Sequence, residues 1–464
     1  MTTVRVRMYK HGLGDCFLVS FGDNQAHMLI DCGVIGGTEG AGDKMREVAQ
    51  NIKDATGGHI DVLVGTHEHW DHLSGFWQAR EVFEEIQFDN VWLAWTEDPS
   101  DEVAKSLGKK RKKTERTLRM AIQGLGMLGS DRARETTERL DGLMCFLGEP
   151  GGAGLGAAGG GTTADALAWV AGRATPHYCH PGEKPLRVKG VEGVRVYVLG
   201  PPEDPAFIKQ DLPSKRDPET YGLTAPGSLE GAFFAATRMQ MGGLDELSPE
   251  ERDEIQRSLP FDAMHQITSE QARNMPFFRD HYGFGKGAED PEAWRRIEHD
   301  WLGTAAQLAL QLDSDTNNTS LALAIELIAS GKALLFVADA QVGNWLSWEK
   351  LSWSVRDEDG TVGKVTSADL LKRTVLYKVG HHGSHNATLR EKGLELMTSP
   401  ELAAMIPVDQ KMAKQKEWNM PFPPLYRALE EKTAGRILRA DQPSSGKRVT
   451  EGPGGLYVDY VVSG

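Results

Sequence analysis

The feature that most constrains the fold of this chain is a run of histidines and acidic residues between a strand pattern and a helix pattern. Residues 66–72 read Thr-His-Glu-His-Trp-Asp-His, which is the pattern H-x-H-x-D-H. The mostly apolar residues 60–65 predict a buried strand, and residues 73–77 predict the first turns of a helix. The run therefore predicts a polar loop that joins the end of a buried strand to the start of a helix.

The spacing within this run suits metal ions. Side chains two apart in an extended segment share a face, so His67 and His69 can bind one metal ion. The turn into the helix then directs Asp71 and His72 towards a second metal ion nearby. Imidazole nitrogen and carboxylate oxygen are ligands that zinc, manganese and iron accept. We therefore expect two divalent metal ions, with zinc favoured and manganese as the alternative.

Length and composition indicate a globular protein with enough material for a large core. At about 150 residues per domain, the 464 residues predict two or three domains. The net charge of −14 argues against a protein that coats nucleic acid, although it is compatible with a local basic groove. We expect no membrane association, because residues 1–20 show no secretory signal and no apolar run reaches a membrane-spanning length. The four cysteines are scattered, which favours a reducing cytoplasm.

Strand and helix patterns along the chain predict one α/β core that is interrupted by two large, mainly helical insertions. The composition changes after residue 97 and again after residue 203, and the core pattern returns each time. The predicted divisions are residues 1–97 for the first half of the core, 98–186 for an insertion with a glycine-rich loop, 187–203 for a core strand, 204–305 for the second insertion and 306–464 for the second half of the core.

At the H-x-H-x-D-H run the sequence resembles the metallo-β-lactamase-fold hydrolases, which carry this motif between a strand and a helix of an αββα sandwich. A closer resemblance, over about residues 1–95, 190–203 and 310–442, is to the hydrolase domain of the bacterial competence DNA-uptake protein family. The motifs that carry it are Gly12-Leu13-Gly14-Asp15, Ile30-Asp31-Cys32-Gly33, Leu199-Gly200-Pro201, Asn317-Asn318-Thr319-Ser320, Ala338-Asp339 and Lys378-Val379-Gly380-His381-His382-Gly383-Ser384.

The resemblance implies roles for residues outside the run. Asp339, at the end of an apolar strand, would bridge the two metals. Asp31 would orient a histidine ligand without binding metal itself. The adjacent His381 and His382 would supply the last histidine ligand, and we favour His382. His381 or His385 would then contact the substrate or donate a proton.

The sequence departs from the superfamily at three places. Asn317 and Asn318 stand where many superfamily enzymes have a histidine ligand. The competence family shares this asparagine. We therefore expect the first metal ion to be bound more weakly. Met420 replaces the histidine of a Gly-His-Pro motif that the family often has near its C-terminus. The insertions match no known pattern, and we expect them to govern substrate choice and to contact a protein partner or a second copy of the chain. Asn318 and Ser384 are predicted to bind substrate.

The resemblance implies a hydrolase of phosphodiester bonds. We expect a nuclease that acts on DNA or RNA through a hydroxide activated by two metals, with Asp71 orienting this nucleophile. Small-molecule phosphodiesterases, esterases and lactonases of the same fold are the alternative, and an acidic surface suits small substrates better than duplex DNA. A non-catalytic scaffold is the third hypothesis.

Two further motifs have simpler explanations. The basic run Lys109–Lys113 could follow a phosphate backbone, but a solvated helix face is favoured because Asp101 and Glu115 flank it. His177, Cys179 and His180 could bind metal, although their spacing is too tight for the usual structural zinc pairs.

Overall fold

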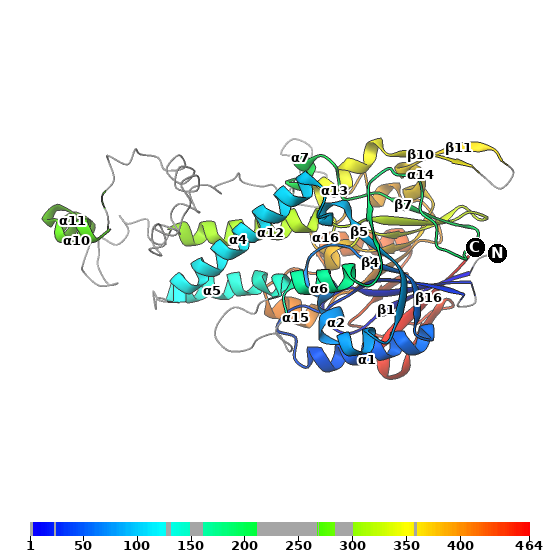
Figure 1. Cartoon of the computed structure of the whole chain (residues 1–464), viewed down its shortest axis with the longest axis horizontal. Coiled ribbons are helices and arrows are strands. Elements are labelled where there is room, and N and C mark those ends of the chain that lie inside the picture. Colours follow the sequence, from blue (N-terminus) through cyan, green and yellow to red (C-terminus); the bar gives the residue numbers. More distant parts are fainter. Residues whose placement is uncertain are drawn as a thin grey trace. The chain divides into compact units, whose positions relative to one another are not determined.

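The computed structural model of the protein describes residues 3–22, 25–126, 131–148, 161–210, 267, 269–283, 300–356 and 360–464. Within these ranges the chain is of the mixed α/β class, as the sequence predicts (Figure 1). The chain divides into two compact units. The first, called the core unit below, comprises Met1–Gly108, Met144–Ala225 and Asp313–Gly464, and the second comprises Lys109–Leu143 and Pro226–Leu312.

The predicted glycine-rich loop and most of the predicted insertion at 204–305 lie outside the described residues. The division of the chain at 97, 186, 203 and 305, and contacts of the insertions with a partner or a second copy, therefore stay predictions. Among the described residues, no helix is both long and apolar enough to cross a bilayer.

The first sheet of the core unit has eight strands and carries the H-x-H-x-D-H run at the end of one of them. Its strand order is β15-β16-β1-β2-β3-β4-β5-β6, in which β3, β4, β5 and β6 are parallel neighbours. The strands are β1 (Thr3–Tyr9), β2 (Cys16–Phe21), β3 (Ala26–Cys32), β4 (His59–Gly65), β5 (Gln87–Ala94), β6 (Pro176–Cys179), β15 (Val449–Glu451) and β16 (Tyr457–Ser463).

The second sheet of the core unit has six strands in the order β14-β13-β12-β9-β8-β7. Strands β9, β12, β13 and β14 are parallel neighbours, while β7 and β8 are antiparallel. The strands are β7 (Val194–Val198), β8 (Leu323–Leu327), β9 (Lys332–Phe336), β12 (Thr374–Lys378), β13 (Ala403–Ile406) and β14 (Ile437–Arg439), and a separate hairpin consists of β10 (Ser352–Arg356) and β11 (Val362–Thr366).

Several helices begin or end at residues that satisfy the helix termini. Thr162 and Thr366 each form a reciprocal capping box with the aspartate three residues later, and Gly57 ends α1 in the left-handed conformation. The helices are α1 (Ala41–Thr56), α2 (Trp70–Gln78), α3 (Arg80–Phe83), α4 (Glu102–Gly126), α5 (Asp131–Met144), α6 (Thr163–Ala171), α7 (Pro205–Ile208), α10 (Ser269–Asn274), α11 (Pro276–Tyr282), α12 (Asp300–Asn317), α13 (Val342–Ser347), α14 (Ser367–Lys372), α15 (Gln410–Gln415) and α16 (Pro423–Thr433).

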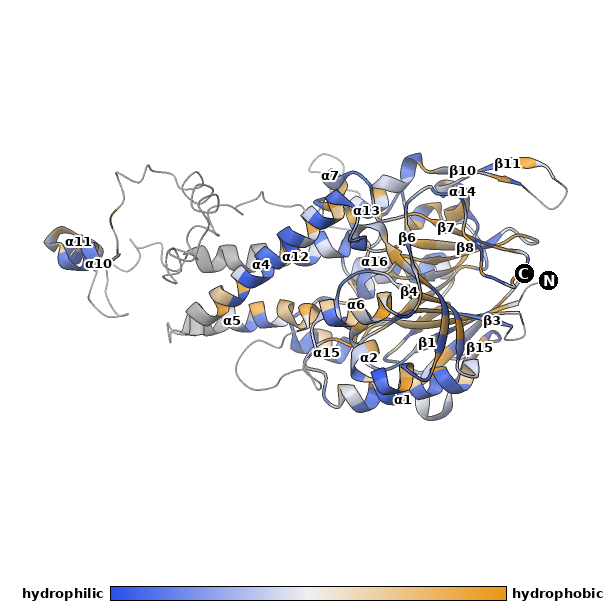
Figure 2. Ribbon diagram, in the orientation of Figure 1, coloured by the Kyte–Doolittle hydropathy of each residue, from blue (hydrophilic) through white to orange (hydrophobic). Residues whose placement is uncertain are grey.

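Three large clusters of buried apolar side chains lie in the described part of the core unit. The first cluster joins the two sheets, since it combines alternate residues of β1, such as Val6, with residues of β8 and β9 such as Ile325. The second packs α13, α14 and α16 on the six-stranded sheet, and the third packs α1, α2, α3 and α6 on the eight-stranded sheet. Figure 2 shows the apolar strands of both sheets. Because each buried Val, Leu or Phe contributes about 1.5–3 kcal/mol, these clusters fix the positions of the strand ends.

The strand ends that lead into the candidate site have unusual backbone conformations. Asp31, Ala338, His381 and His382 all have positive φ angles, of 55°, 47°, 39° and 52°. A residue other than glycine held there costs about 1–3 kcal/mol, and such strain clusters at functional sites. Gly33 allows a close approach of its segment to the first turn of α2, because a Cβ atom there would lie 2.5 Å from the carbonyl carbon of Asp71.

Candidate metal centre

The H-x-H-x-D-H run occupies the end of β4, a short loop and the first turn of α2. Strand β4 ends at Gly65 and α2 begins at Trp70, so the predicted strand and helix are both present. The side chains of the run that could bind metal are fully buried, at 0% exposure; they are His67, His69, Asp71 and His72. Because buried polar groups need hydrogen-bond or metal partners, the residues that contact these four side chains identify the rest of the centre.

Asp31 fixes the orientation of His72. The carboxylate accepts hydrogen bonds from the backbone N–H and the hydroxyl of Thr66, at 2.9 and 2.7 Å. It also accepts the Nδ1–H of His72 at 2.8 Å. The lone pair of His72 Nε2 therefore points away from Asp31, and this nitrogen lies 3.1 Å from Oδ2 of Asp339. Asp31 thus orients the imidazole of His72.

His382, rather than His381, lies beside the carboxylates. Its Nδ1 lies 2.7 Å from the carbonyl oxygen of Pro407, which can only accept, so Nδ1 carries the proton. Its Nε2 lies 2.9 Å from Oδ2 of Asp71 and 3.7 Å from Oδ2 of Asp339. The ring of His382 therefore presents Nε2 to the same carboxylates as His72 does.

Asp339 is held by one oxygen atom, while the other faces the histidines. Its Oδ1 accepts the backbone N–H of His381 at 3.1 Å and lies 3.4 Å from Nζ of Lys378. The buried ammonium of Lys378 also donates to the carbonyl of Ala338 at 2.7 Å and pairs with Oδ2 of Asp15 at 2.5 Å. Lys378 thus ties Asp15 and Asp339 together and leaves Oδ2 of Asp339 directed at His72.

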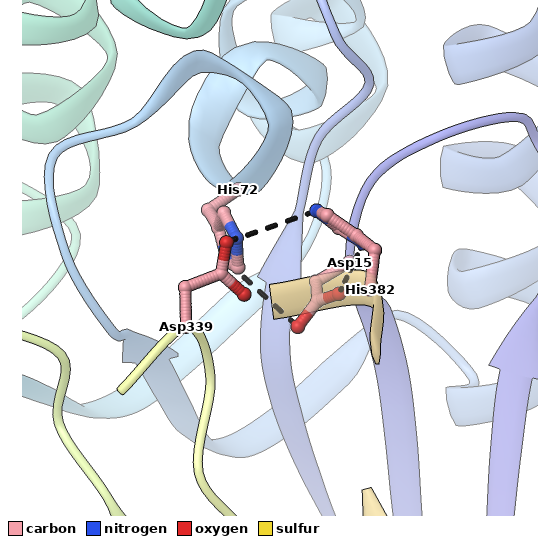
Figure 3. A group of neighbouring side chains, drawn as sticks. All are labelled: Asp15, His72, Asp339 and His382. Carbon is pink, nitrogen blue, oxygen red and sulfur yellow. Dashed lines mark ion pairs between the residues drawn. The ribbon is translucent and has the colours of Figure 1, made fainter. Parts of the chain in front are cut away.

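Asp15, His72, Asp339 and His382 form a buried group that could hold a metal ion, because one potential ligand atom from each lies within 4.8 Å of the others (Figure 3). Asp15, however, approaches the two rings at 3.8 Å on their Nδ1 sides, which already have partners. The Nε2 atoms face Asp71 and Asp339 instead, with Asp71 Oδ2 3.7 Å from His72 Nε2. The geometry therefore favours Asp71 over Asp15 as a ligand.

His67 and His69 form a neighbouring pair. Thr66 Oγ1, which donates to Asp31, accepts the Nδ1–H of His67 at 3.1 Å, so His67 Nε2 is available. This Nε2 lies 3.1 Å from Nδ1 of His69. With zinc–nitrogen bonds of about 2.0–2.1 Å, two nitrogen ligands of one tetrahedral zinc lie about 3.3 Å apart. The pair is therefore spaced as two ligands of one ion would be.

Unpartnered buried atoms test whether cations fit this centre. Leaving a buried polar atom without a hydrogen bond costs about 1–3 kcal/mol, so natural proteins have few such atoms. In this centre several buried atoms have no hydrogen-bond partner, and they include carboxylate oxygens and imidazole nitrogens. They are Asp15 Oδ1, His69 Nε2, Asp71 Oδ1, His72 Nε2, Asp313 Oδ1 and Asp339 Oδ2. A divalent cation would satisfy Asp71 Oδ1, His72 Nε2 and Asp339 Oδ2 among them, so these residues fit a metal.

The protonation of the histidines follows from burial and charge. Burial, together with His72, lowers the pKa of His67 well below its usual value, and burial lowers the pKa of His69 to about 3. Both rings are therefore neutral near pH 7, as metal ligands must be. For His72, burial opposes the charged ring, but Asp339 and other carboxylates raise its pKa well above the usual value. A bound cation would replace that proton.

His381 belongs to a hydrogen-bonded ring of polar side chains next to the centre. Ser384 Oγ donates to Asn386 Oδ1 at 3.0 Å, and Asn386 Nδ2 donates to Gln341 Oε1 at 2.8 Å. Gln341 Nε2 therefore donates to His381 Nδ1, at 3.2 Å. Burial lowers the pKa of His381 to about 4, so the neutral ring carries its proton on Nε2. Ser384 also lies 3.1 Å from this ring.

Two other predicted site residues have different surroundings. The side-chain amide of Asn318 uses all four of its hydrogen-bonding positions within the chain: it donates to the carbonyls of Ile208 and Gln210 and accepts from the backbone of Gln341 and Asn344. His385 is half-buried, with its ring 6.1 Å from that of Phe422. The proposed roles of Asn318 and Ser384 in substrate binding, and of His385 in proton donation, stay predictions.

Sequence reasoning did not assign Asp15, Lys378, Asp313, Gln341 or Asn386 to the site. Asp15 and Lys378 stand within the motifs that carry the resemblance, so an acidic and a basic residue in those motifs were the available signals. The contacts of Lys378 with Asp15 and Asp339 then place both residues at the centre. The other three have no motif, since only the fold brings them near the histidines.

Two smaller groups of potential ligands lie elsewhere among the described residues, and each includes exposed or half-exposed members; they are His177, Cys179 and Glu183, and His59, Asp61 and Asp89. His177 is paired with Glu183 at 3.1 Å, and His180 lies near Glu203, which supports a surface ion pair for this segment.

The fold and the centre together define a mixed α/β protein with a buried Asp/His group that could hold a metal ion. No protein-family model matches the chain, and no curated protein sequence matches it either.

Proposed function

We propose that the protein is a metal-dependent hydrolase of the metallo-β-lactamase αββα fold that cleaves phosphodiester bonds. The observation that carries the proposal is the convergence of the Nε2 atoms of His72 and His382 on Asp71 and Asp339, with the His67–His69 pair beside them. Two sheets that share a core, each covered by helices on its outer face, support the αββα arrangement.

The residues divide into two sets of ligands. His67 Nε2 and His69 Nδ1 would hold one divalent cation, zinc or manganese. Asp71 and the Nε2 atoms of His72 and His382 would hold the second, and Asp339 Oδ2 would serve both; Asp31 and Pro407 keep the two Nε2 lone pairs directed inward. When bound, such cations lower the pKa of a water molecule and stabilise negative charge on phosphoryl oxygens.

The remaining polar residues prepare the centre for this chemistry. Lys378 and the backbone N–H of His381 hold Oδ1 of Asp339, so its other oxygen stays directed inward. The Gln341 donor keeps the proton of His381 on Nε2, where it can donate to a phosphoryl oxygen of the substrate. Complete burial of the ligands excludes bulk water and strengthens these electrostatic interactions.

A nuclease acting on DNA or RNA is the first candidate, because the motifs resemble a family held to cleave DNA. A small-molecule phosphodiesterase, or an esterase or lactonase, is the second. One observation favours this second candidate: every proposed ligand is fully buried, which restricts access for a bulky polymer. The net charge of −14 points the same way, since it repels a polyanion.

The test is cleavage of single-stranded and double-stranded DNA, RNA and bis-p-nitrophenyl phosphate with zinc or manganese. We expect Asp71→Ala to lower turnover by more than about 100-fold. The matched control is Asp43→Ala, which removes an 88% exposed carboxylate that pairs with Arg46. Cleavage of polymers supports the nuclease, and cleavage of the small diester alone supports the second candidate. Full turnover by Asp71→Ala, or turnover after metal removal, would refute the proposal.

A further inference from the structure

Asp313, near the end of α12, is a buried carboxylate that the ligand sets above do not use. It is 8% exposed, and its Oδ1 has no hydrogen-bond partner. That oxygen lies 3.8 Å from Nε2 of His69, which is fully buried and also lacks a hydrogen-bond partner. The other carboxylate oxygen accepts a hydrogen bond from Nδ2 of Asn317 at 3.0 Å. A potential acceptor and a potential donor therefore face each other within the centre.

The other three histidines of the centre show what this contact is for. In each, the ring nitrogen that is not proposed to bind metal has an acceptor, which fixes the tautomer: Asp31 for His72, the Pro407 carbonyl for His382, and the Thr66 hydroxyl for His67. His69 is turned the other way, with Nδ1 towards His67. Its proton must then be on Nε2 if Nδ1 is to bind metal, and the atom that faces Nε2 is Oδ1 of Asp313.

We propose that Asp313 is the positioning residue for His69, accepting its Nε2–H so that Nδ1 is available to the first metal. Asn317 holds Asp313 in place, which accounts for an asparagine where a histidine ligand would be expected. The inference deepens the proposed function and rests on it. A shift of about 1 Å would shorten the 3.8 Å separation to a normal hydrogen bond.

The consequence is a site-selective effect on metal affinity. Loss of an acceptor behind a metal-binding histidine typically lowers metal affinity by about 10–100-fold. Asp313→Ala should weaken the site of His69, whereas Asp31→Ala should weaken the site of His72. General destabilisation of the fold would weaken both sites together, so the pair of variants separates positioning from a structural role.

The experiment is a titration of the full chain with cadmium-113, followed by NMR, in which the two sites give separate resonances. Metal content after dialysis is measured in parallel. We expect two resonances for the unaltered chain, of which Asp313→Ala loses one and Asp31→Ala loses the other. Asp313→Asn, which keeps an acceptor oxygen and the side-chain volume, should retain more of the first resonance than Asp313→Ala, and it replaces that variant if the alanine form does not fold.

Two results would overturn the inference. If Asp313→Ala and Asp313→Asn both keep the two affinities within twofold while Asp31→Ala lowers one, Asp313 has no role in positioning and the proposed function survives. If the unaltered chain binds no cadmium in the centre, and Asp71→Ala changes nothing, the proposed function fails and the inference fails with it.

Discussion

Replacement of Lys378 by methionine should destabilise the protein strongly, because this lysine is the cation that pairs with two buried carboxylates. Its ammonium lies 2.5 Å from Asp15 and 3.4 Å from Asp339, and the side chains are 0–3% exposed. At an effective dielectric constant of about 20, the closer pair attracts by about 7 kcal/mol before the cost of removing the ammonium from water. Measured losses for one partner of a buried pair are about 3–5 kcal/mol, and we expect that range for Lys378→Met.

The assay is urea unfolding of the full chain followed by tryptophan fluorescence, first with a chelator and then with zinc. The loss should be smaller with zinc, because a bound cation would compensate the charge of Asp339 and stabilise the folded state by mass action. The control is Lys392→Met, since Lys392 and its partner Glu349 are 49% and 65% exposed and such pairs contribute about 0–1 kcal/mol. A loss below about 1 kcal/mol for Lys378→Met in chelator, equal to that of the control, would refute the reasoning.

Three further predictions concern protonation, hydrogen bonding and close packing. Burial lowers the pKa of His11 and of His381 to about 4, so between pH 6.5 and 4 the unfolded chain binds protons that the folded chain does not. The free energy of unfolding should therefore fall as the pH falls through this window. The urea midpoint of His11→Gln should fall less steeply over the same window than that of the unaltered chain. Gln341→Leu removes the donor to His381 Nδ1 and should lower turnover by about 10-fold or more while the metal content stays unchanged. A reduced metal content would instead show that this hydrogen-bonded network serves metal binding. Gly33→Ala should lower metal content, because its Cβ would lie 2.5 Å from the Asp71 carbonyl carbon. Gly363→Ala, whose Cβ would have nothing within 4 Å, is the control.

Local sequence was sufficient for the strand–loop–helix around the metal run. Strand β4 and helix α2 lie where the apolar pattern and the helical pattern predict them, because periodicity reports which faces of an element are buried. The mixed α/β class follows from the same signal and is confirmed. The preference for His382 over His381, by contrast, could not come from two adjacent identical residues, and the contacts with Pro407 and Asp71 favour it.

The sequence by itself determined which chemical groups this protein has and the strand ends at which they stand, since motif spacing and apolar periodicity are local properties. Only the tertiary structure decided which atoms face one another: that Asp31 holds His72, that Lys378 joins Asp15 to Asp339, and that Asp313 faces His69 although the two are far apart in the sequence. The physical reason is that pairing between buried polar groups depends on how segments distant in the sequence pack within the core unit, and no short window of sequence records that packing.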